Sequence, residues 1–265
     1  MTAMQTLPGP LERRARFTRE RFLRRAIAVA LVLVSAMVFD ALVLRSLWLG
    51  PDGLARAEAL DVYRYFRVIG WWPTWLIVGL ALVLTDLADR PKRPTGLTGP
   101  PDAYFRGVLV AGSAALAGIS ADLLKLFSGR VRPASRQDGQ WVVLDGGASG
   151  IGVPEAGGWW TGWLERGFLR GFADGSNLAF PSSHAATAFG GAIALAFLMP
   201  RLTPLLLPLA AGCALTRLLA GAHWLSDVVA GAMLGYAAAL LIRRWVGGTR
   251  LAKGPLPSWA RDPQA

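Results

Sequence analysis

Six long apolar stretches constrain the fold of this chain more than any other feature. Several of them reach the roughly 20 residues that an α-helix needs to cross a bilayer, and the others approach that length. Hydrophobic residues make up 53% of the sequence and charged residues 17%, which is too apolar for an ordinary soluble domain. The stretches run over about 26–44, 68–84, 105–124, 180–199, 202–219 and 228–242. The sequence therefore predicts an all-α, polytopic membrane bundle of six transmembrane helices. A soluble all-α protein, with the shortest stretches as buried helices, is the weaker alternative.

The first apolar stretch follows a basic arm, residues 1–25, which carries seven arginines between Arg13 and Arg25. A cleaved signal peptide has a shorter apolar core and a small-residue cleavage site soon after it. Here the stretch continues to Phe39 and Asp40, so we expect a retained helix. A basic arm can bind nucleic acid, but beside a membrane helix it is better explained by contact with anionic lipid. We therefore expect the bilayer, and not a nucleic acid, as its partner.

Six spans and a cytoplasmic N-terminus would place both termini in the cytoplasm, with the protein in the inner (plasma) membrane. Of the 28 Lys and Arg residues, 17 fall in the segments predicted as cytoplasmic and 11 on the other side. This asymmetry agrees with the positive-inside rule. The third and fourth helices would then be joined by a long extracytoplasmic loop, residues 127–179.

The chain is predicted to be one membrane domain, residues 26–246, between the arm and a disordered cytoplasmic tail, residues 247–265. The long loop is rich in glycine and tryptophan, and loops of this length are usually functional or disordered. Its tryptophans indicate either a short interfacial helix at about 159–169 or packing of the loop on the bundle. The single cysteine, Cys213, is expected to pack within the fifth helix. No Cys/His spacing typical of a metal site occurs.

The only two histidines of the chain each lie in a polar cluster. His184 ends the segment Pro181-Ser182-Ser183-His184, and His223 stands four residues before Asp227. Histidine is the side chain best suited to move protons, or to accept a phosphoryl group, near neutral pH. In the predicted topology both clusters lie on the extracytoplasmic face. This shared position favours one reactive site over scattered structural residues.

Basic residues on the same predicted face are suited to hold a phosphate. Lys125 and Arg132 follow the third helix and Arg217 ends the fifth, and guanidinium groups make two-point contacts with phosphate oxygens. Pro181 and Ser182 are typical of a helix start, whose free N–H groups bind anions.

Structural explanations compete with these roles for each cluster taken alone. A His–Asp pair at this spacing can be structural, although Asp227 is also placed to orient one ring nitrogen of His223. Basic residues at helix ends often extend to lipid headgroups, and we explain Arg130, Arg166 and Arg170 in that way. The coincidence of all the clusters on one face favours the catalytic interpretation.

The combined spacing resembles the three-part signature of the type 2 phosphatidic acid phosphatase superfamily. The three parts are Lys125-x6-Arg132-Pro133, Pro181-Ser182-Ser183-His184 and Arg217-x5-His223-x3-Asp227. That superfamily includes membrane lipid phosphatases, soluble bacterial acid phosphatases and vanadium haloperoxidases. The resemblance covers about 105–242, the predicted catalytic core. It implies an all-α core and hydrolysis of a phosphomonoester or pyrophosphate through a phosphohistidine, with no metal or other cofactor.

The resemblance also implies a role for each site residue. His223 would be the nucleophile, oriented by Asp227, and His184 would protonate the leaving oxygen and later activate water. The phosphate would be held by Lys125, Arg132, Arg217, Ser182 and the amides of Ser183 and His184. Ser183 stands where the family usually has glycine, and Thr216 stands where it usually has serine. We expect these two departures to affect selectivity more than activity.

The sequence thus predicts an integral membrane lipid phosphatase with its site at the outer surface of the inner membrane. Candidate substrates are phosphatidylglycerol phosphate, phosphatidate, a polyprenyl pyrophosphate and the phosphate of a lipid A type glycolipid. A lipid phosphotransferase, in which a lipid hydroxyl replaces water, would share the phosphoenzyme. A haloperoxidase fits six spans less well. A non-catalytic membrane protein, such as a transporter, would not need the His–Asp pair.

Overall fold

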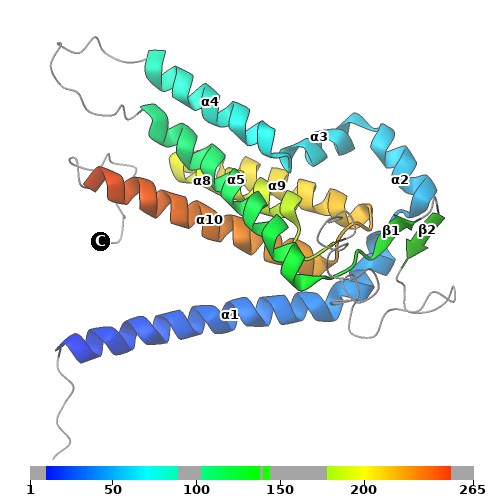
Figure 1. Ribbon diagram of the computed structural model, residues 1–265, viewed down its shortest axis with the longest axis horizontal. Coiled ribbons are helices and arrows are strands. Elements are labelled where there is room, and N and C mark those ends of the chain that lie inside the picture. The colour runs from blue at the N-terminus through cyan, green and yellow to red at the C-terminus, as the bar shows by residue number, and fades with distance from the viewer. Residues whose placement is uncertain (1–9, 89–102, 138–139, 144–177, 252–265) are drawn as a thin grey trace, which may run out of the picture.

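A computed structural model of the protein describes residues 10–88, 103–137, 140–143 and 178–251. Within these ranges the fold is a bundle of α-helices with one small β-hairpin (Figure 1). The helices of the bundle are α4 (Trp72–Ala88), α5 (Ala103–Ser128), α8 (Ser183–Leu198), α9 (Thr203–Leu219) and α10 (Leu225–Leu251). Helix α1 (Pro10–Leu47) lies along one side and contacts α9 and α10. Two short helices, α2 (Gly50–Ala59) and α3 (Asp61–Ile69), connect α1 to α4.

The smaller elements lie in the connections. A 3₁₀ turn, η3 (Pro200–Leu202), links α8 to α9. The hairpin follows α5 and pairs β1 (Ala134–Gln137) antiparallel with β2 (Gln140–Val143). The tryptophan-rich segment of the predicted loop, including 159–169, lies outside the described residues. Helix α10 continues to Leu251, into the segment predicted as the tail.

Four described helices are long and apolar enough to cross a membrane: Glu20–Leu47, Tyr104–Ser128, Pro200–Leu219 and Leu225–Gly247. The pair α3 and α4 passes the same test but is bent by 70°, which makes five if the pair is one broken span. The remaining apolar stretch forms α8, which has only 16 residues. The helical bundle and its membrane character are therefore confirmed, but six continuous spans are not.

The predicted helix at 68–84 is broken at Gly70, and Pro73 explains the break. Proline has no N–H, so it cannot continue the hydrogen-bond ladder of α3 into α4. Side chains of α4 instead satisfy the carbonyls at the end of α3. The Thr74 hydroxyl donates to the Val68 carbonyl (2.7 Å) and the Trp75 indole donates to the Ile69 carbonyl (2.8 Å).

Helix α8 is short and apolar because it is the centre of the bundle, packed against α5, α9 and α10. Small residues allow this close packing, as is common between membrane helices. A Cβ atom added at Gly235 of α10 would lie 2.6 Å from the Ala186 carbonyl oxygen of α8. One added at Gly190 of α8 would lie 2.9 Å from the Ser113 carbonyl oxygen of α5. These close contacts hold α8 at a fixed position between α5 and α10, and therefore also fix the position of its N-terminus.

Candidate active site

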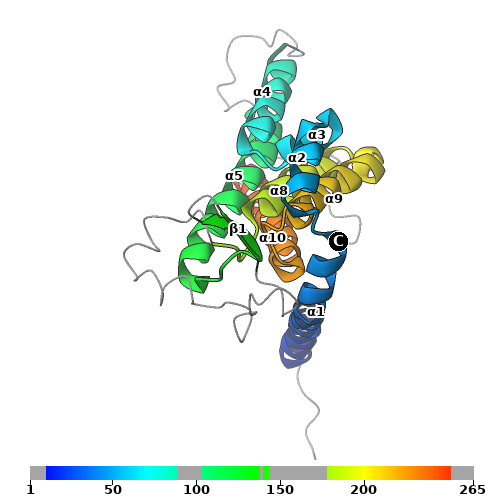
Figure 2. The same cartoon turned by 90° about the vertical axis from the view of Figure 1, so that its right-hand side faces the viewer.

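The three predicted clusters lie together at one end of the bundle, where α5 and α9 end and α8 and α10 begin (Figure 2). Backbone hydrogen bonds join the segments that carry them. The Ala179 N–H donates to the Arg130 carbonyl (2.7 Å) and the Ser182 N–H donates to the Asp227 carbonyl (2.9 Å). The Ala134 N–H donates to the carbonyl of Gly221 (2.8 Å), which turns the chain with φ of 61°. Segments distant in sequence are thereby held in one rigid arrangement.

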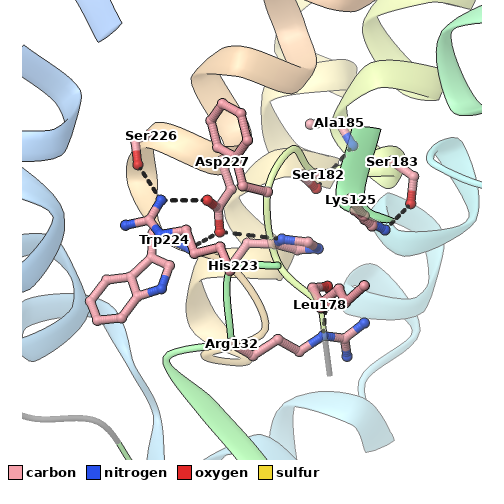
Figure 3. A network of polar contacts seen from close by, with 12 residues as sticks. Lys125, Arg132, Leu178, Ser182, Ser183, Ala185, His223, Trp224, Ser226 and Asp227 are labelled. Atoms are coloured by element: carbon pink, nitrogen blue, oxygen red, sulfur yellow. Dashed lines mark hydrogen bonds and ion pairs between the residues drawn. The ribbon is translucent and has the colours of Figure 1, made fainter. Parts of the chain in front are cut away.

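His223 lies in the turn between α9 and α10 and is 2% exposed. Its Nδ1 is 3.6 Å from Oδ2 of Asp227, within ion-pair range but longer than a hydrogen bond. Asp227 is fully buried in the first turn of α10, and its Oδ2 also accepts the Trp224 N–H (2.8 Å). In Figure 3 the His223 ring extends from Asp227 towards Lys125. The carboxylate faces one ring nitrogen, and the ring also lies within hydrogen-bonding range of the Ala179 backbone.

The surroundings of His223 keep its ring neutral. Burial lowers the pKa of His223 well below its usual value of 6.5, and the positive charges of Arg217, Lys125 and Arg132 lower it further. A neutral imidazole retains a lone pair on one nitrogen, which a nucleophile requires. Three cations around an uncharged ring also form a site with an excess of positive charge.

The pKa of His223 gives a direct prediction. Replacement of His184 by asparagine, in protein without a histidine tag, leaves His223 as the only histidine. Because its pKa is lowered, the ¹⁵N-labelled ring should remain neutral as the pH falls from 8 to 6. An ordinary histidine, with a pKa near 6.5, would be mostly protonated at the end of that range. A titration midpoint close to 6.5 in the NMR spectrum would contradict the burial and charges described here.

His184 is the second residue of α8, and the local sequence explains how this helix begins. Ser182 is the N-cap residue, and its hydroxyl accepts the Ala185 N–H (3.4 Å). The N–H groups at the start of a helix have no partner within the helix and attract anions. His184 also lies within electrostatic range of Arg217, His223 and Lys125. The start of α8 therefore adds a second histidine and a helix N-terminus to the same site.

The basic residues contribute to the site from three elements. Lys125, at the end of α5, donates to the Ser183 hydroxyl (2.8 Å) and to Asp122 (3.1 Å). Arg132 donates from Nε to the Leu178 carbonyl at 3.5 Å, a long contact. Arg217, in the last turn of α9, has a buried Nε without a hydrogen-bond partner among the described residues. A buried donor of this kind is costly unless a ligand accepts from it, and a phosphate oxygen would do so.

The two departures from the family pattern make different contacts. The Ser183 hydroxyl accepts from Lys125, so it contacts one of the predicted phosphate-binding groups. The Thr216 hydroxyl is buried and donates to the Cys213 carbonyl (2.7 Å), within its own helix. Cys213 is itself fully buried, in agreement with the packing role expected from the sequence. Only Ser183, of the two departures, lies where it can influence a bound phosphate.

Arg130 was misjudged from the sequence as a residue that extends to lipid headgroups. Its side chain is buried, and Nη1 donates to Oδ1 of Asp227 (2.6 Å) and to the Ser226 hydroxyl (2.7 Å). Nη2 donates to Oδ2 of Asp40 on α1 (2.7 Å), and the guanidinium lies over the Trp224 ring at 5.1 Å. An acidic residue inside an apolar stretch usually has a buried partner. Asp40 was therefore the sequence signal that could have assigned Arg130. Arg166 and Arg170 lie outside the described residues.

The break between α3 and α4 lies directly against His184. A Cβ atom added at Gly70 would be 2.9 Å from Cβ and 3.0 Å from Cδ2 of His184, and 2.6 Å from Sγ of Cys213. Only glycine leaves the imidazole room at this point. Sequence reasoning did not assign Gly70 to the site, because its contact with His184 depends on the bend.

Comparison with known proteins identifies the family. A family model described as the PAP2 superfamily matches residues 106–250, more than half of the chain. The matched residues include every predicted site residue, whereas Asp40 and Gly70 lie outside them. Comparisons with curated proteins and with solved structures gave no significant match. Within the part of the chain that the structure describes, no group of three or more His, Cys, Asp or Glu side chains is placed to hold a metal ion. The chain belongs to the PAP2 superfamily, that of the type 2 phosphatidic acid phosphatases.

Proposed function

We propose that this membrane protein is a phosphatase that hydrolyses a lipid phosphate or pyrophosphate through a phosphohistidine at His223. The observation that carries the proposal is the buried Arg217 Nε, which has no hydrogen-bond partner among the described residues, together with a buried His223 that faces Asp227 and whose pKa is lowered. A phosphoryl group would supply the missing acceptor and offset the charge of the nearby cations. It would also bring the phosphorus within reach of the ring nitrogen of His223 that does not face Asp227.

In the first step, the Nε2 lone pair of His223 attacks the phosphorus and the bond to the leaving oxygen breaks. His184, which must be protonated once the phosphoryl group is bound, donates its proton to that oxygen. The lipid product then leaves as an alcohol, or as a lipid phosphate if the substrate is a pyrophosphate. Asp227 stabilises the positive charge that develops on the His223 ring. Lys125, Arg132, Arg217 and the N-terminus of α8 hold the phosphoryl oxygens.

In the second step, His184 takes a proton from water as the water oxygen attacks the phosphorus. The P–N bond breaks, inorganic phosphate leaves, and His223 recovers its lone pair. If a lipid hydroxyl replaces water, the same steps describe a phosphotransferase. We also propose that the reaction needs no metal ion, as the family resemblance implies, and we therefore expect EDTA to leave the rate unchanged.

A lipid substrate is supported by the position of the site in a membrane bundle. The reactive groups lie among the ends of helices that are apolar enough to span a bilayer. Large apolar side chains are exposed on the helices beside the site, including Phe127 of α5 and Trp71 at the α3–α4 break. A lipid can leave its acyl chains in the bilayer against such surfaces while its headgroup enters the polar site.

The direct test is phosphate release from purified lipid phosphates in detergent. Phosphatidate, phosphatidylglycerol phosphate, a polyprenyl pyrophosphate and lipid A would form the panel, with His223→Ala protein as the control. Release from at least one lipid by the wild-type protein alone would support the proposal. Absence of release from all of them would reject it, and transfer of the phosphoryl group to an added lipid alcohol would identify a transferase.

We also propose six spans, both termini in the cytoplasm of an inner-membrane protein, and a site on the extracytoplasmic face. Single cysteines test this orientation in a Cys213→Ser background. Ser149→Cys, in the predicted long extracytoplasmic loop, should react with an impermeant thiol reagent in intact spheroplasts. Arg201→Cys, exposed in η3 between α8 and α9, should react only after lysis. The reverse labelling pattern would place the site in the cytoplasm.

Gly70→Ala should impair the reaction through His184. The added methyl would lie 2.6 Å from Sγ of Cys213 and 2.9 Å from Cβ of His184, so these side chains must shift and His184 would lose its present position. Misplacement of a catalytic group by about 1 Å costs on the order of 100-fold in rate. We expect this loss in kcat with an alkyl phosphate, without loss of folded protein. Gly247→Ala is the matched control, since nothing lies within 4 Å of its added Cβ. Equal activity of the two variants would mean that His184 is not confined by Gly70.

A further inference from the structure

Asp40 is an acidic residue within the apolar first helix, and its side chain is buried. Its carboxylate reaches out of α1 to the first turn of α10. Oδ1 accepts the Ser226 N–H (2.8 Å), and Oδ2 accepts from the Ser226 hydroxyl (2.6 Å) and from Nη2 of Arg130 (2.7 Å). A buried charge in a membrane helix is unfavourable and is retained mainly where it has a specific role.

Arg130 connects Asp40 to the reactive histidine. Its Nη2 donates to Asp40 while its Nη1 donates to Oδ1 of Asp227, so each carboxylate receives a different nitrogen. The other oxygen of Asp227, Oδ2, is thereby left to face Nδ1 of His223 and to accept the Trp224 N–H. Without Asp40, the guanidinium of Arg130 loses one of its two carboxylate acceptors. Both of its η nitrogens can then donate to the two oxygens of Asp227, which is the two-point geometry that Arg–carboxylate pairs prefer. That rearrangement would turn Oδ2 away from His223.

We propose that Asp40 is a positioning residue for catalysis, which holds Arg130 and Ser226 so that Asp227 keeps one oxygen for His223. The proposal rests on the proposed function of His223 as the nucleophile. Asp40 lies outside residues 106–250, the part of the chain that matches the family. The N-terminal helix is then a component of the catalytic unit and not only a membrane anchor.

A double-mutant cycle in the full-length protein tests the proposal. Asp40→Ala should lower kcat by about 10- to 100-fold, because Asp227 is displaced. The inhibition constant of inorganic phosphate should change by less than about three-fold, because the hydrogen bonds of Asp40 go to Arg130 and Ser226 and not to the predicted phosphate-binding residues. In an Asp227→Asn background, Asp40→Ala should have no further effect on kcat. An equal loss of kcat in both backgrounds would overturn the proposal, and so would wild-type kcat in folded Asp40→Ala protein.

Asp86→Ala is the matched control for removal of a paired aspartate. Asp86 forms an ion pair with Arg106 between α4 and α5, near the start of α5 and far from Lys125 at its end. This variant should retain the wild-type kcat. If Asp40→Ala protein does not fold, Asp40→Asn takes its place in the cycle, since it keeps an acceptor for Ser226 but loses the charge that holds Arg130.

A readout that needs no turnover separates this inference from the proposed function. The ¹⁵N shifts of His223, measured in a His184→Asn background, report which ring nitrogen carries the proton. Asp227 should hold the proton on Nδ1, and Asp40→Ala should shift the population towards the Nε2–H form. An inactive wild-type protein whose tautomer responds to Asp40→Ala would reject the function and keep the positioning role. If the protein is active, and Asp40→Ala changes neither the tautomer of His223 nor kcat, the proposed function stands and the positioning role of Asp40 is rejected.

Discussion

Replacement of His223 by alanine should abolish phosphate release from every phosphate ester, by roughly 10⁴- to 10⁶-fold in kcat, the loss seen when a nucleophile is removed. The ring forms the bond to phosphorus in the proposed mechanism, so no property of the leaving group can compensate for its absence. The variant should remain folded and should still bind inorganic phosphate, because the cations and the N-terminus of α8 are unchanged. Steady-state assays and phosphate competition would measure the two effects separately.

Replacement of His184 by alanine should have a smaller effect that depends on the leaving group. A general acid contributes on the order of 10²- to 10⁴-fold when the leaving alkoxide needs a proton. The phenolate of p-nitrophenyl phosphate leaves without one, so rapid mixing with this ester should give a burst of nitrophenol. Slow turnover should follow, because the same histidine activates water. A burst that is equally impaired for alkyl and aryl esters would reject the role of His184 as an acid.

Arg217→Lys should have the largest effect among the phosphate-binding residues. A single ammonium cannot reproduce the planar two-point contact of a guanidinium. In addition, the buried Nε of Arg217 has no hydrogen-bond acceptor among the described residues. The loss of such a contact in the transition state costs about 2–4 kcal/mol, or roughly 30- to 1,000-fold in rate. Arg132→Lys should follow the same pattern. The measurement is kcat/KM for the preferred lipid.

Arg201→Lys is the matched control for these substitutions. Arg201 is exposed in η3, between α8 and α9 and away from the site, so its replacement should change kcat/KM by less than two-fold. A similar loss at Arg201 and Arg217 would mean that the phosphate pocket has been placed wrongly.

Much of this site could be predicted from the sequence because its residues occur at fixed spacing at the ends of helices. His184 lies two residues after the N-cap Ser182, and Asp227 lies in the first turn of the helix after His223, so local rules predicted that both lie at helix starts. The length of the apolar stretches also identified most of the apolar helices. Length alone could not distinguish a helix buried among its neighbours from one that spans the lipid. For that reason α8, with 16 residues at the centre of the bundle, was expected as a full span.

The contributions that the sequence did not reveal depend on tertiary contacts. Arg130 and Asp40 are 90 residues apart, and only the packing of α1 against α10 brings them together. Gly70 contacts His184 because Pro73 interrupts the apolar stretch and bends the chain by 70°. Neither relation has a local signature, although the presence of Asp40 in an apolar stretch indicated that some buried partner had to exist.

The most direct test of a phosphohistidine at His223 is to trap the phosphoenzyme and locate the phosphate. Wild-type and His184→Ala protein would be mixed with p-nitrophenyl phosphate, quenched in base, in which phosphohistidine is stable, and digested for mass spectrometry. We expect a phosphoryl group on the peptide that contains His223, with more of it in the His184→Ala protein, because hydrolysis of the phosphoenzyme is slowed there. A phosphoryl group on His184, on any other residue, or on none in a protein that releases phosphate from the ester would contradict the mechanism.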